Sequence, residues 1–210
     1  AAWAVLDALA QHSQLLEKNL LALRSQVEGA TGRKANTLPR QIEKLEAERH
    51  ELDRCSEKLL KAVFDRTQDI CEVIRLHCME QMQRLSEAHP SIYLQRRWMD
   101  EVLTRLTDDN PELRSKALLL IRHWYTLSKK PPADTQQTLN QFAQDNLAKF
   151  ADRIFDVDRR VAIAALRCIR APTLGEALDD ETFEKVVGLC FRSEDIHVRE
   201  EAAVLINMHV

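Results

Sequence analysis

The spacing of apolar residues predicts a long helix at the start of the chain. Between Ala1 and about Val27 apolar side chains recur every three or four positions, which is the spacing of an amphipathic helix. The stripe consists of Trp3, Leu6, Leu9, Leu16, Leu20 and Leu23. We expect this helix to be the antiparallel partner of the next one.

A second, longer helix is predicted from Pro39 to about Ser86, where no glycine or further proline occurs. Its apolar positions recur close to heptad spacing, at Ile42, Leu45, Leu52, Leu59 and Val63. As one helix it would be roughly 70 Å long at about 1.5 Å per residue, which is longer than a globular core is wide. We therefore expect residues 1–88 to form long antiparallel helices, a projecting coiled-coil arm with a loop at about 28–38. Two successive core helices with a break between them are the alternative.

Shorter helices are predicted after the His89-Pro90 pair, and a weak repeat relates three of them. The expected helices span 91–107, 111–127, 138–155, 159–170, 180–191 and 196 to the end. In the repeat, Val or Leu is followed by Arg or Ala, then by Ala after four positions and by Leu or Cys after seven. Copies begin at Leu113, Val161 and Val198, which are 48 and 37 positions apart. HEAT and armadillo units have a similar period of about 40–47 residues, so residues 89–210 are predicted to form HEAT-like repeats.

Composition agrees with an all-α fold of long helices and α-solenoid repeats. The 210 residues include only 4 Gly and 6 Pro, and aromatic residues make up 5%. Sparse turn-forming and aromatic residues disfavour a many-stranded β protein. The net charge is −3, but it is uneven. Residues 96–170 contain 14 Lys and Arg against 10 Asp and Glu, whereas residues 171–210 contain 3 against 9. This asymmetry could steer a charged partner, or it could reflect ordinary solvated helix faces.

No motif of a catalytic or cofactor site occurs, so we expect a protein that is not an enzyme and that uses no cofactor, metal or small-molecule substrate. The sequence has no phosphate-binding glycine loop, no HExxH and no nucleophile elbow. The acid pairs at Asp108 and Asp179 precede predicted helices, where capping explains them. The five cysteines contain no CxxC, and we interpret them as reduced thiols of a nuclear or cytosolic protein.

Neither a membrane span nor a complete chain is expected. No uncharged apolar run of 18 residues occurs. Both ends of the sequence lie within apolar-periodic segments, which is typical of a fragment cut from a longer helical chain.

The order of several segments resembles the stromalin (stromal antigen) family, the HEAT-repeat subunit of cohesin. The GRKAN loop at 32–36 leads into a long charged helix with EAERHEL, followed by KAVFDRTQDICEVIRLHCMEQM. DDNPELRSKALLLIRHWY and FADRIFDVDRRVAIAALRCI come later. The best local identities are residues 61–64, 152–154 and 156–157. The resemblance covers nearly the whole chain from Gly32 and is one of order and spacing.

This resemblance implies a scaffold located on chromosomes in the nucleus. Stromalins help to hold sister chromatids together by binding the kleisin subunit, loading factors, regulatory peptides with aromatic motifs, and DNA. The expected partners are therefore a kleisin-type cohesin subunit or other chromosomal proteins, with double-stranded DNA as a further candidate. A paralogue that acts outside the cohesin ring to hold homologous chromosomes together in meiosis is one alternative. An unrelated HEAT-repeat adaptor is another.

The chain departs from the family where the family receives an aromatic peptide. The family's tryptophan corresponds to Thr104 and the preceding glycine to Leu103, while its arginine corresponds to Lys149 and a nearby aromatic residue to Asn146. Lysine lacks the planar fork with which arginine stacks on an aromatic ring. The resemblance therefore implies a divergent member with altered peptide binding, and a specialised meiotic role is one form that this could take.

The residues themselves also make the same region a candidate partner-binding surface. It combines positive charge with aromatic side chains, and interfaces favour Trp, Tyr and Arg at their energetic centres. The candidate residues are Arg96, Arg97, Trp98, Thr104, Lys149, Phe150, Arg153, Arg159 and Arg160. Core packing is the competing explanation for Trp98 and the stronger one for Trp124. Ion pairs with Asp152, Asp156 or Asp158 are the competing explanation for Arg153 and Arg160.

Overall fold

The computed structural model describes residues 2–27, 33–128, 131–171, 174 and 178–209, and every regular element among them is helical. The all-α prediction is therefore confirmed for the described part of the chain. The chain divides into two compact units, Ala1–Arg66 and Thr67–Val210, which are described separately. None of the described helices is long and apolar enough to cross a membrane.

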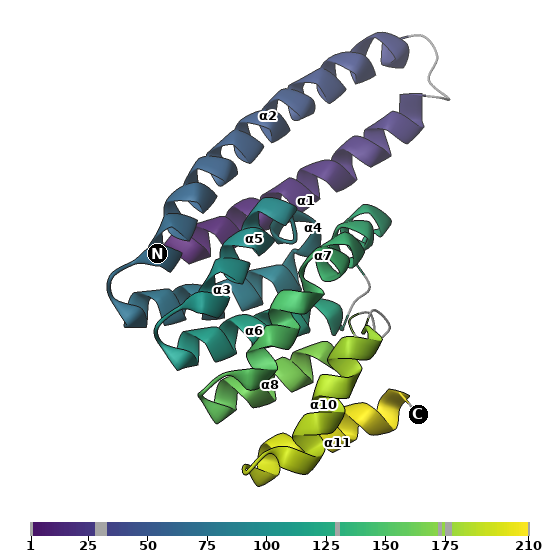
Figure 1. Ribbon diagram of the computed structural model, residues 1–210. Helices are drawn as coiled ribbons and strands as arrows, with labels where there is room; N and C mark the ends of the chain where they lie inside the picture. Colours follow the sequence, from purple (N-terminus) through teal and green to yellow (C-terminus); the bar gives the residue numbers. More distant parts are fainter. Residues whose placement is uncertain (1, 28–32, 129–130, 172–173, 175–177, 210) are drawn as a thin grey trace. The chain divides into compact units, whose positions relative to one another are not determined.

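The first unit contains the helices α1 (Ala2–Val27) and α2 (Arg33–Phe64), which lie side by side (Figure 1). Ion pairs join the end of α1 to the early part of α2, as in Arg24–Glu46 at 2.6 Å, and the middle of α1 to a later part, as in Glu17–Arg49 at 3.8 Å. The two helices are therefore antiparallel, as expected. That they form a coiled-coil arm that projects from the repeats stays a prediction.

Two details of the predicted long helices are wrong. The helix α2 begins at Arg33, so Pro39 lies inside it and not in its first turn, and only residues 28–32 of the expected loop lie outside the described helices. The expected continuous helix over 39–86 ends at Phe64, is followed by the 3₁₀ turn η1 (Asp65–Gln68), and resumes as α3 (Glu72–Ala88). The break that the alternative assumed is therefore present, and α3 belongs to the second unit.

The second unit is a stack of helices in two layers (Figure 1). One layer contains α3, α6 (Pro111–Tyr125), α8 (Arg159–Ile169) and α11 (Ile196–His209), each in contact with the next. The other contains α5 (Arg96–Thr104), α7 (Ala133–Asp152) and α10 (Asp180–Arg192). Short turns complete the unit: α4 (Pro90–Tyr93), η2 (Arg105–Thr107) and η3 (Arg153–Phe155). The helix expected over 91–107 is thus divided, and α7 begins earlier than expected.

The repeat predicted from the sequence coincides with the core of this stack. Its alanines, Ala117, Ala165 and Ala202, are completely buried. A methyl side chain lets neighbouring helix backbones approach closely, and a larger residue would separate them. Side-chain caps begin α6, α8 and α10, where Asn110, Asp158 and Asp179 accept backbone N–H groups. Of the acid pairs, Asp179 is therefore a cap, whereas Asn110 caps α6 and Asp108 has a different role.

That role belongs to a turn that recurs before each helix of the α3–α11 layer. The side chain at its first position accepts the N–H group two residues later. The pairs are Asp69 with Cys71 at 2.8 Å, Asp108 with Asn110 at 3.0 Å, Asp156 with Asp158 at 3.0 Å, and Ser193 with Asp195 at 3.3 Å. The first of these turns reveals an additional copy of the repeat, which the sequence pattern did not show.

An arginine six residues after the turn residue joins one repeat to the next. Arg114 donates through Nη1 to the carbonyl oxygens of Asp108 and Asp109 at 2.8 and 3.1 Å, and through Nε and Nη2 to both carboxylate oxygens of Asp156 at 2.9 and 2.7 Å. Arg75 makes a simpler version of these contacts, from Nη1 to the carbonyl of Asp69 at 2.7 Å and from Nη2 to one carboxylate oxygen of Asp108 at 3.0 Å. We call this arrangement the arginine clamp.

The clamp between α6 and the turn before α8 is well shielded from water. The side chains of Arg114 and Asp156 are 11% and 4% exposed. Burial opposes ionisation of Asp156, but hydrogen bonds from Arg114 and from the N–H of Asp158 outweigh it, so the pKa of Asp156 lies below its ordinary value. Both groups are therefore charged at neutral pH, and the bidentate pair compensates for their desolvation.

The clamp is missing at one junction. Ala162 occupies the arginine position of α8, and Ser193 occupies the aspartate position of the following turn. Other ion pairs connect α8 to α11 and the turn before it: the exposed Arg159 with Asp195 at 3.4 Å, and Arg167 and Arg170 with the partly buried Glu201 at 2.6 and 3.0 Å. Both clamp residues are thus absent together at the same junction.

Replacing Arg114 with Met should strongly destabilise the second unit. The change keeps much of the aliphatic volume but leaves the buried carboxylate of Asp156 without its partner, which should lower the free energy of unfolding by about 3 kcal/mol. Arg159→Met is the matched control, because Arg159 is 67% exposed in its pair and such pairs contribute about 1 kcal/mol or less. Urea unfolding followed by circular dichroism measures both, and equal losses would contradict the role of the clamp.

Candidate partner-binding surface

The predicted surface residues fall into two groups in the second unit. Arg96, Arg97 and Trp98 open α5, Thr104 closes it, and Lys149 and Phe150 lie in the last turn of α7. Arg153, Arg159 and Arg160 lie in the turn η3 and at the start of α8. Their role in partner binding stays a prediction, but their surroundings show which of them can offer a free charge or ring.

The charge of Arg96 is already matched by two acids. Its Nε donates to the Asp100 carboxylate at 2.9 Å, and Nη1 pairs with Asp145. These hydrogen bonds, the one that Asp145 accepts first, raise the pKa of Arg96, and the same bond holds the pKa of Asp145 below its ordinary value. The guanidinium also lies over the ring of Phe142, with its central carbon 5.4 Å from the ring centroid. Arg96 therefore forms part of a fixed cluster that joins α5 to α7.

The aromatic members of the predicted set contribute mainly to the core. Phe150 is completely buried and lies 6.1 Å from Phe142, centroid to centroid. Trp124 packs on the same ring at 5.9 Å, as core packing predicted. Trp98 is 7% exposed, and the guanidinium of Arg97 lies over its ring at 4.5 Å. Phe150 is thus a core residue and not a surface contact, and cation–π stacking already involves Trp98.

Three of the positions where the chain departs from the stromalin pattern make polar contacts, Asn146 with Lys149 and Thr104 with its neighbour in sequence. Asn146 is buried, with Nδ2 donating to the carbonyl of Phe142 at 3.0 Å, and its Oδ1 accepts from Lys149 Nζ at 3.0 Å. Thr104 is exposed, and its hydroxyl accepts a hydrogen bond from Arg105 Nη2 at 3.0 Å. No aromatic wall is provided at either position, so this part of the surface is suited to polar contacts.

Acids close to the second group neutralise its arginines, as the competing explanation predicted. Arg160 pairs with Asp158 at 2.9 Å, and Arg153 lies 3.7 Å from Asp156 and donates to the carbonyl of Leu106 at 3.3 Å. The hydrogen bond from Arg160 is the main reason why the pKa of Asp158 falls to about 2. These arginines form ion pairs and hydrogen bonds within the fold. They could contact an acidic ligand only while they also remain paired with their own aspartates.

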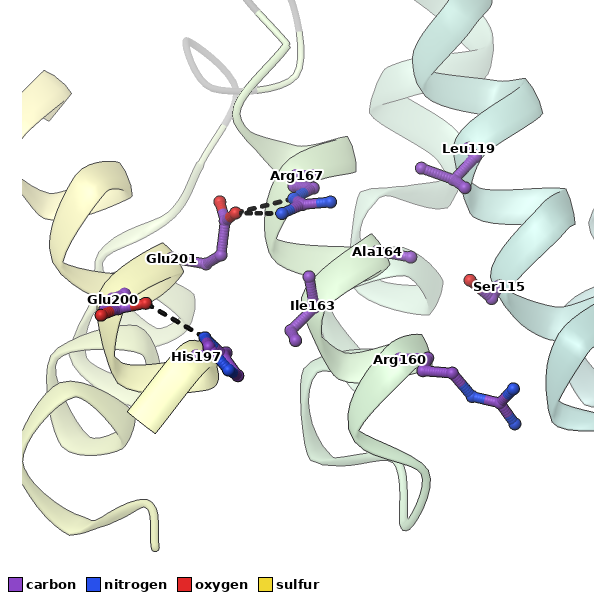
Figure 2. A pocket seen from close by; sticks show the side chains of 9 residues that line it. All are labelled: Ser115, Leu119, Arg160, Ile163, Ala164, Arg167, His197, Glu200 and Glu201. Carbon is purple, nitrogen blue, oxygen red and sulfur yellow. Dashed lines mark hydrogen bonds and ion pairs between the residues drawn. The ribbon is translucent and has the colours of Figure 1, made fainter. Parts of the chain in front are cut away.

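A groove that the sequence did not predict lies over α8, between α6 and α11 (Figure 2). Its volume is about 330 Å³. The small side chains of Ser115 and Ala164 leave this space open, and Leu119 and Ile163 make part of its lining apolar. Its rim is charged: Arg167 pairs with Glu201 at 2.6 Å, and His197 lies 3.2 Å from Glu200 (Figure 2).

The groove could accommodate a side chain or peptide segment, but its charges are balanced within the protein. Its cations have acidic neighbours, so it has no strong preference for a ligand of one charge. Among the described residues, no three His, Cys, Asp or Glu side chains are grouped so that they could hold a metal ion.

Comparisons with known proteins identify the fold. No family model matches the chain, and no curated protein matches it. Among solved structures, the cohesin subunit Scc3 from Z. rouxii (residues 88–1035) has a TM-score of 0.68 at 18% sequence identity. The match covers 97% of this chain and 24% of that chain, so the chain spans about a quarter of its neighbour. This likeness confirms the helical-repeat solenoid.

The Asp158 cap gives a pH-dependent test of this local electrostatics. Asp158→Ala removes the N-cap of α8, which should lower the free energy of unfolding by about 1 kcal/mol at pH 7. The folded-state pKa of about 2 lies below the ordinary 3.8, so the contribution is complete above about pH 4 and disappears as the pH falls through 2. Wild type and variant should therefore converge in acid.

Thermal unfolding between pH 2 and pH 7 measures this difference. Asp109→Ala, at an exposed aspartate beside the N-cap of α6, is the control and should change stability by less than about 0.5 kcal/mol. A gap between wild type and Asp158→Ala that stays constant down to pH 2 would show that the carboxylate charge is not responsible.

Proposed function

We propose that this chain is a segment of a non-enzymatic scaffold in chromosome cohesion, located on chromosomes in the nucleus. The observation that supports this most is the likeness to cohesin subunit Scc3, which extends over 97% of the chain at a TM-score of 0.68. The order of sequence segments that resembles stromalins is an independent argument, because it was recognised from the residues alone.

The expected activity is binding. A solenoid exposes a long surface relative to its length, and such surfaces receive extended partners. We expect a kleisin-type subunit and regulatory peptides to bind the α5–α7 side, where Lys149 is exposed. Double-stranded DNA is a further candidate ligand. Because many arginines are paired with acids, DNA binding should be weak and should decrease steeply with salt.

A paralogue that acts outside the cohesin ring, holding homologous chromosomes together in meiosis, is the second candidate. It is favoured by the network of Asn146 and Lys149 beside the exposed Thr104, which occupies the place of the family's aromatic pocket. A partner that brings an aromatic motif would lose its stacking contacts there. Polar groups that replace Asn146 as the acceptor for Lys149 would suit this surface better. An unrelated adaptor would require the family resemblance to be accidental.

A titration with a kleisin-type subunit tests the first candidate. The 210-residue chain should bind a labelled kleisin segment in fluorescence anisotropy at low salt, and Lys149→Glu should weaken this binding by about tenfold, since it places a negative charge at an interface that favours a cation. Gln144→Glu, on the exposed face of the same helix, is the control and should have little effect. If neither the kleisin segment nor duplex DNA binds at low salt, the cohesion scaffold is refuted.

Purification of the full-length protein from cells separates the two candidates. Recovery of the cohesin ring ATPase subunits together with the protein would support the scaffold within the ring and would exclude a paralogue that works only outside it. Recovery of chromosomal partners without these ATPases would favour the paralogue.

A further inference from the structure

One face of α10 forms a hollow with Phe155 of the turn η3. Its volume is about 430 Å³. The α10 residues that line it are spaced by three or four positions, as one helix face requires: Glu181, Glu184, Lys185, Gly188, Leu189 and Arg192. We call it the α10 hollow. It contains none of the residues predicted from the sequence and is distinct from the groove of Figure 2.

Large apolar side chains are exposed around the α10 hollow. Phe155 is 54% exposed and Phe191 is 80% exposed, whereas Phe142 and Phe150 of the same unit are completely buried. Phe191 follows Gly188 by three positions and so lies on the same side of α10. Val157, two residues after Phe155, is 99% exposed. Exposed apolar side chains gathered beside a hollow are typical of a surface that a partner covers.

Gly188 has no reason for being glycine within the fold itself. It lies inside α10, where glycine is less stable than alanine because it loses more backbone freedom on folding. A Cβ atom added at Gly188 would have nothing within 4 Å, so no neighbouring element requires the missing side chain. A helical glycine that faces open space leaves room for an external group to approach the backbone closely.

The charges around the α10 hollow favour a cationic partner. Lys185 is already paired with Glu181 at 2.7 Å, and Asp152 also acts on it electrostatically. Glu184 and Arg192 add one exposed acid and one exposed base to the lining. The lining itself is therefore balanced, and the surplus of acids lies around it, where Asp179 and Asp180 begin α10. The surrounding sequence agrees, since residues 171–210 contain 9 acids and 3 bases.

We propose that the α10 hollow binds a short basic peptide of a partner protein. One aromatic or aliphatic side chain of the peptide lies against Gly188, between Phe155 and Leu189. A neighbouring Lys or Arg of the peptide pairs with Glu184. The proposal does not depend on the cohesion role, because it rests on the hollow, the exposed phenylalanines, the glycine and the acids around them.

Selection from a random heptapeptide library displayed on phage tests the proposal with the 210-residue chain immobilised. Enriched peptides should combine an aromatic or aliphatic residue with an adjacent Lys or Arg. Synthetic copies, titrated by fluorescence anisotropy, should bind Gly188→Trp at least tenfold more weakly, because the indole fills the hollow. Glu184→Gln should weaken binding about threefold and make it less sensitive to salt.

Three further variants separate an effect on binding from an effect on folding. Gln144→Trp places the same indole on an exposed face of α7 and should leave binding unchanged. Phe191→Ser removes an apolar contact without adding bulk and should also weaken binding. Gly188→Ala should raise the melting temperature by about 2 °C, because nothing opposes the added methyl group. Peptides that bind Gly188→Trp as tightly as wild type, acidic consensus sequences, or no enrichment over the bare support would each overturn the proposal.

Discussion

The bidentate pair between Arg114 and Asp156 determines how one repeat sits on the next. The guanidinium is fixed to the carbonyls of its own turn at 2.8 and 3.1 Å and to the following turn at 2.7 and 2.9 Å. Its planar geometry therefore restricts both the distance and the angle between α6 and the turn before α8. The buried alanines permit the close approach of the helices, and the clamp selects one arrangement among those that the alanines allow.

Local neutralisation is the common feature of the charged residues on this solenoid. Arg96, Arg153 and Arg160 each have an acid within reach, so a count of basic residues overstates the free positive charge. The proposed binding site lies instead where the surface has open space, at Gly188, and where an apolar ring is exposed, at Phe191. Shape and apolar exposure indicate binding sites here better than net charge does.

The sequence was sufficient for the repeats, because their alanine positions correspond directly to helix contacts. The sequence was insufficient where the residues that usually mark a repeat or a helix break are replaced by others. The copy of the repeat at Arg75 was missed because Cys78 replaces the alanine and Gln81 replaces the leucine. The break before α3 was not expected in the main prediction because no glycine or proline marks it. The turn there is held by Asp69, whose side chain accepts from the Cys71 N–H.

The candidate site was predicted less well, since apolar periodicity says which residues are buried together but not which cavities remain. Phe150 seemed a plausible contact because it stands beside Lys149 in sequence, yet adjacent residues point to different sides of a helix and Phe150 faces the core. The junction of α8 and α11 has a further consequence. It lacks the bidentate clamp and is joined by ion pairs of which Arg159–Asp195 is the most exposed, and salt screens exposed charges over about 8 Å at physiological ionic strength. The attachment of α11 to α8 therefore varies more with the ionic medium than the clamped junctions do.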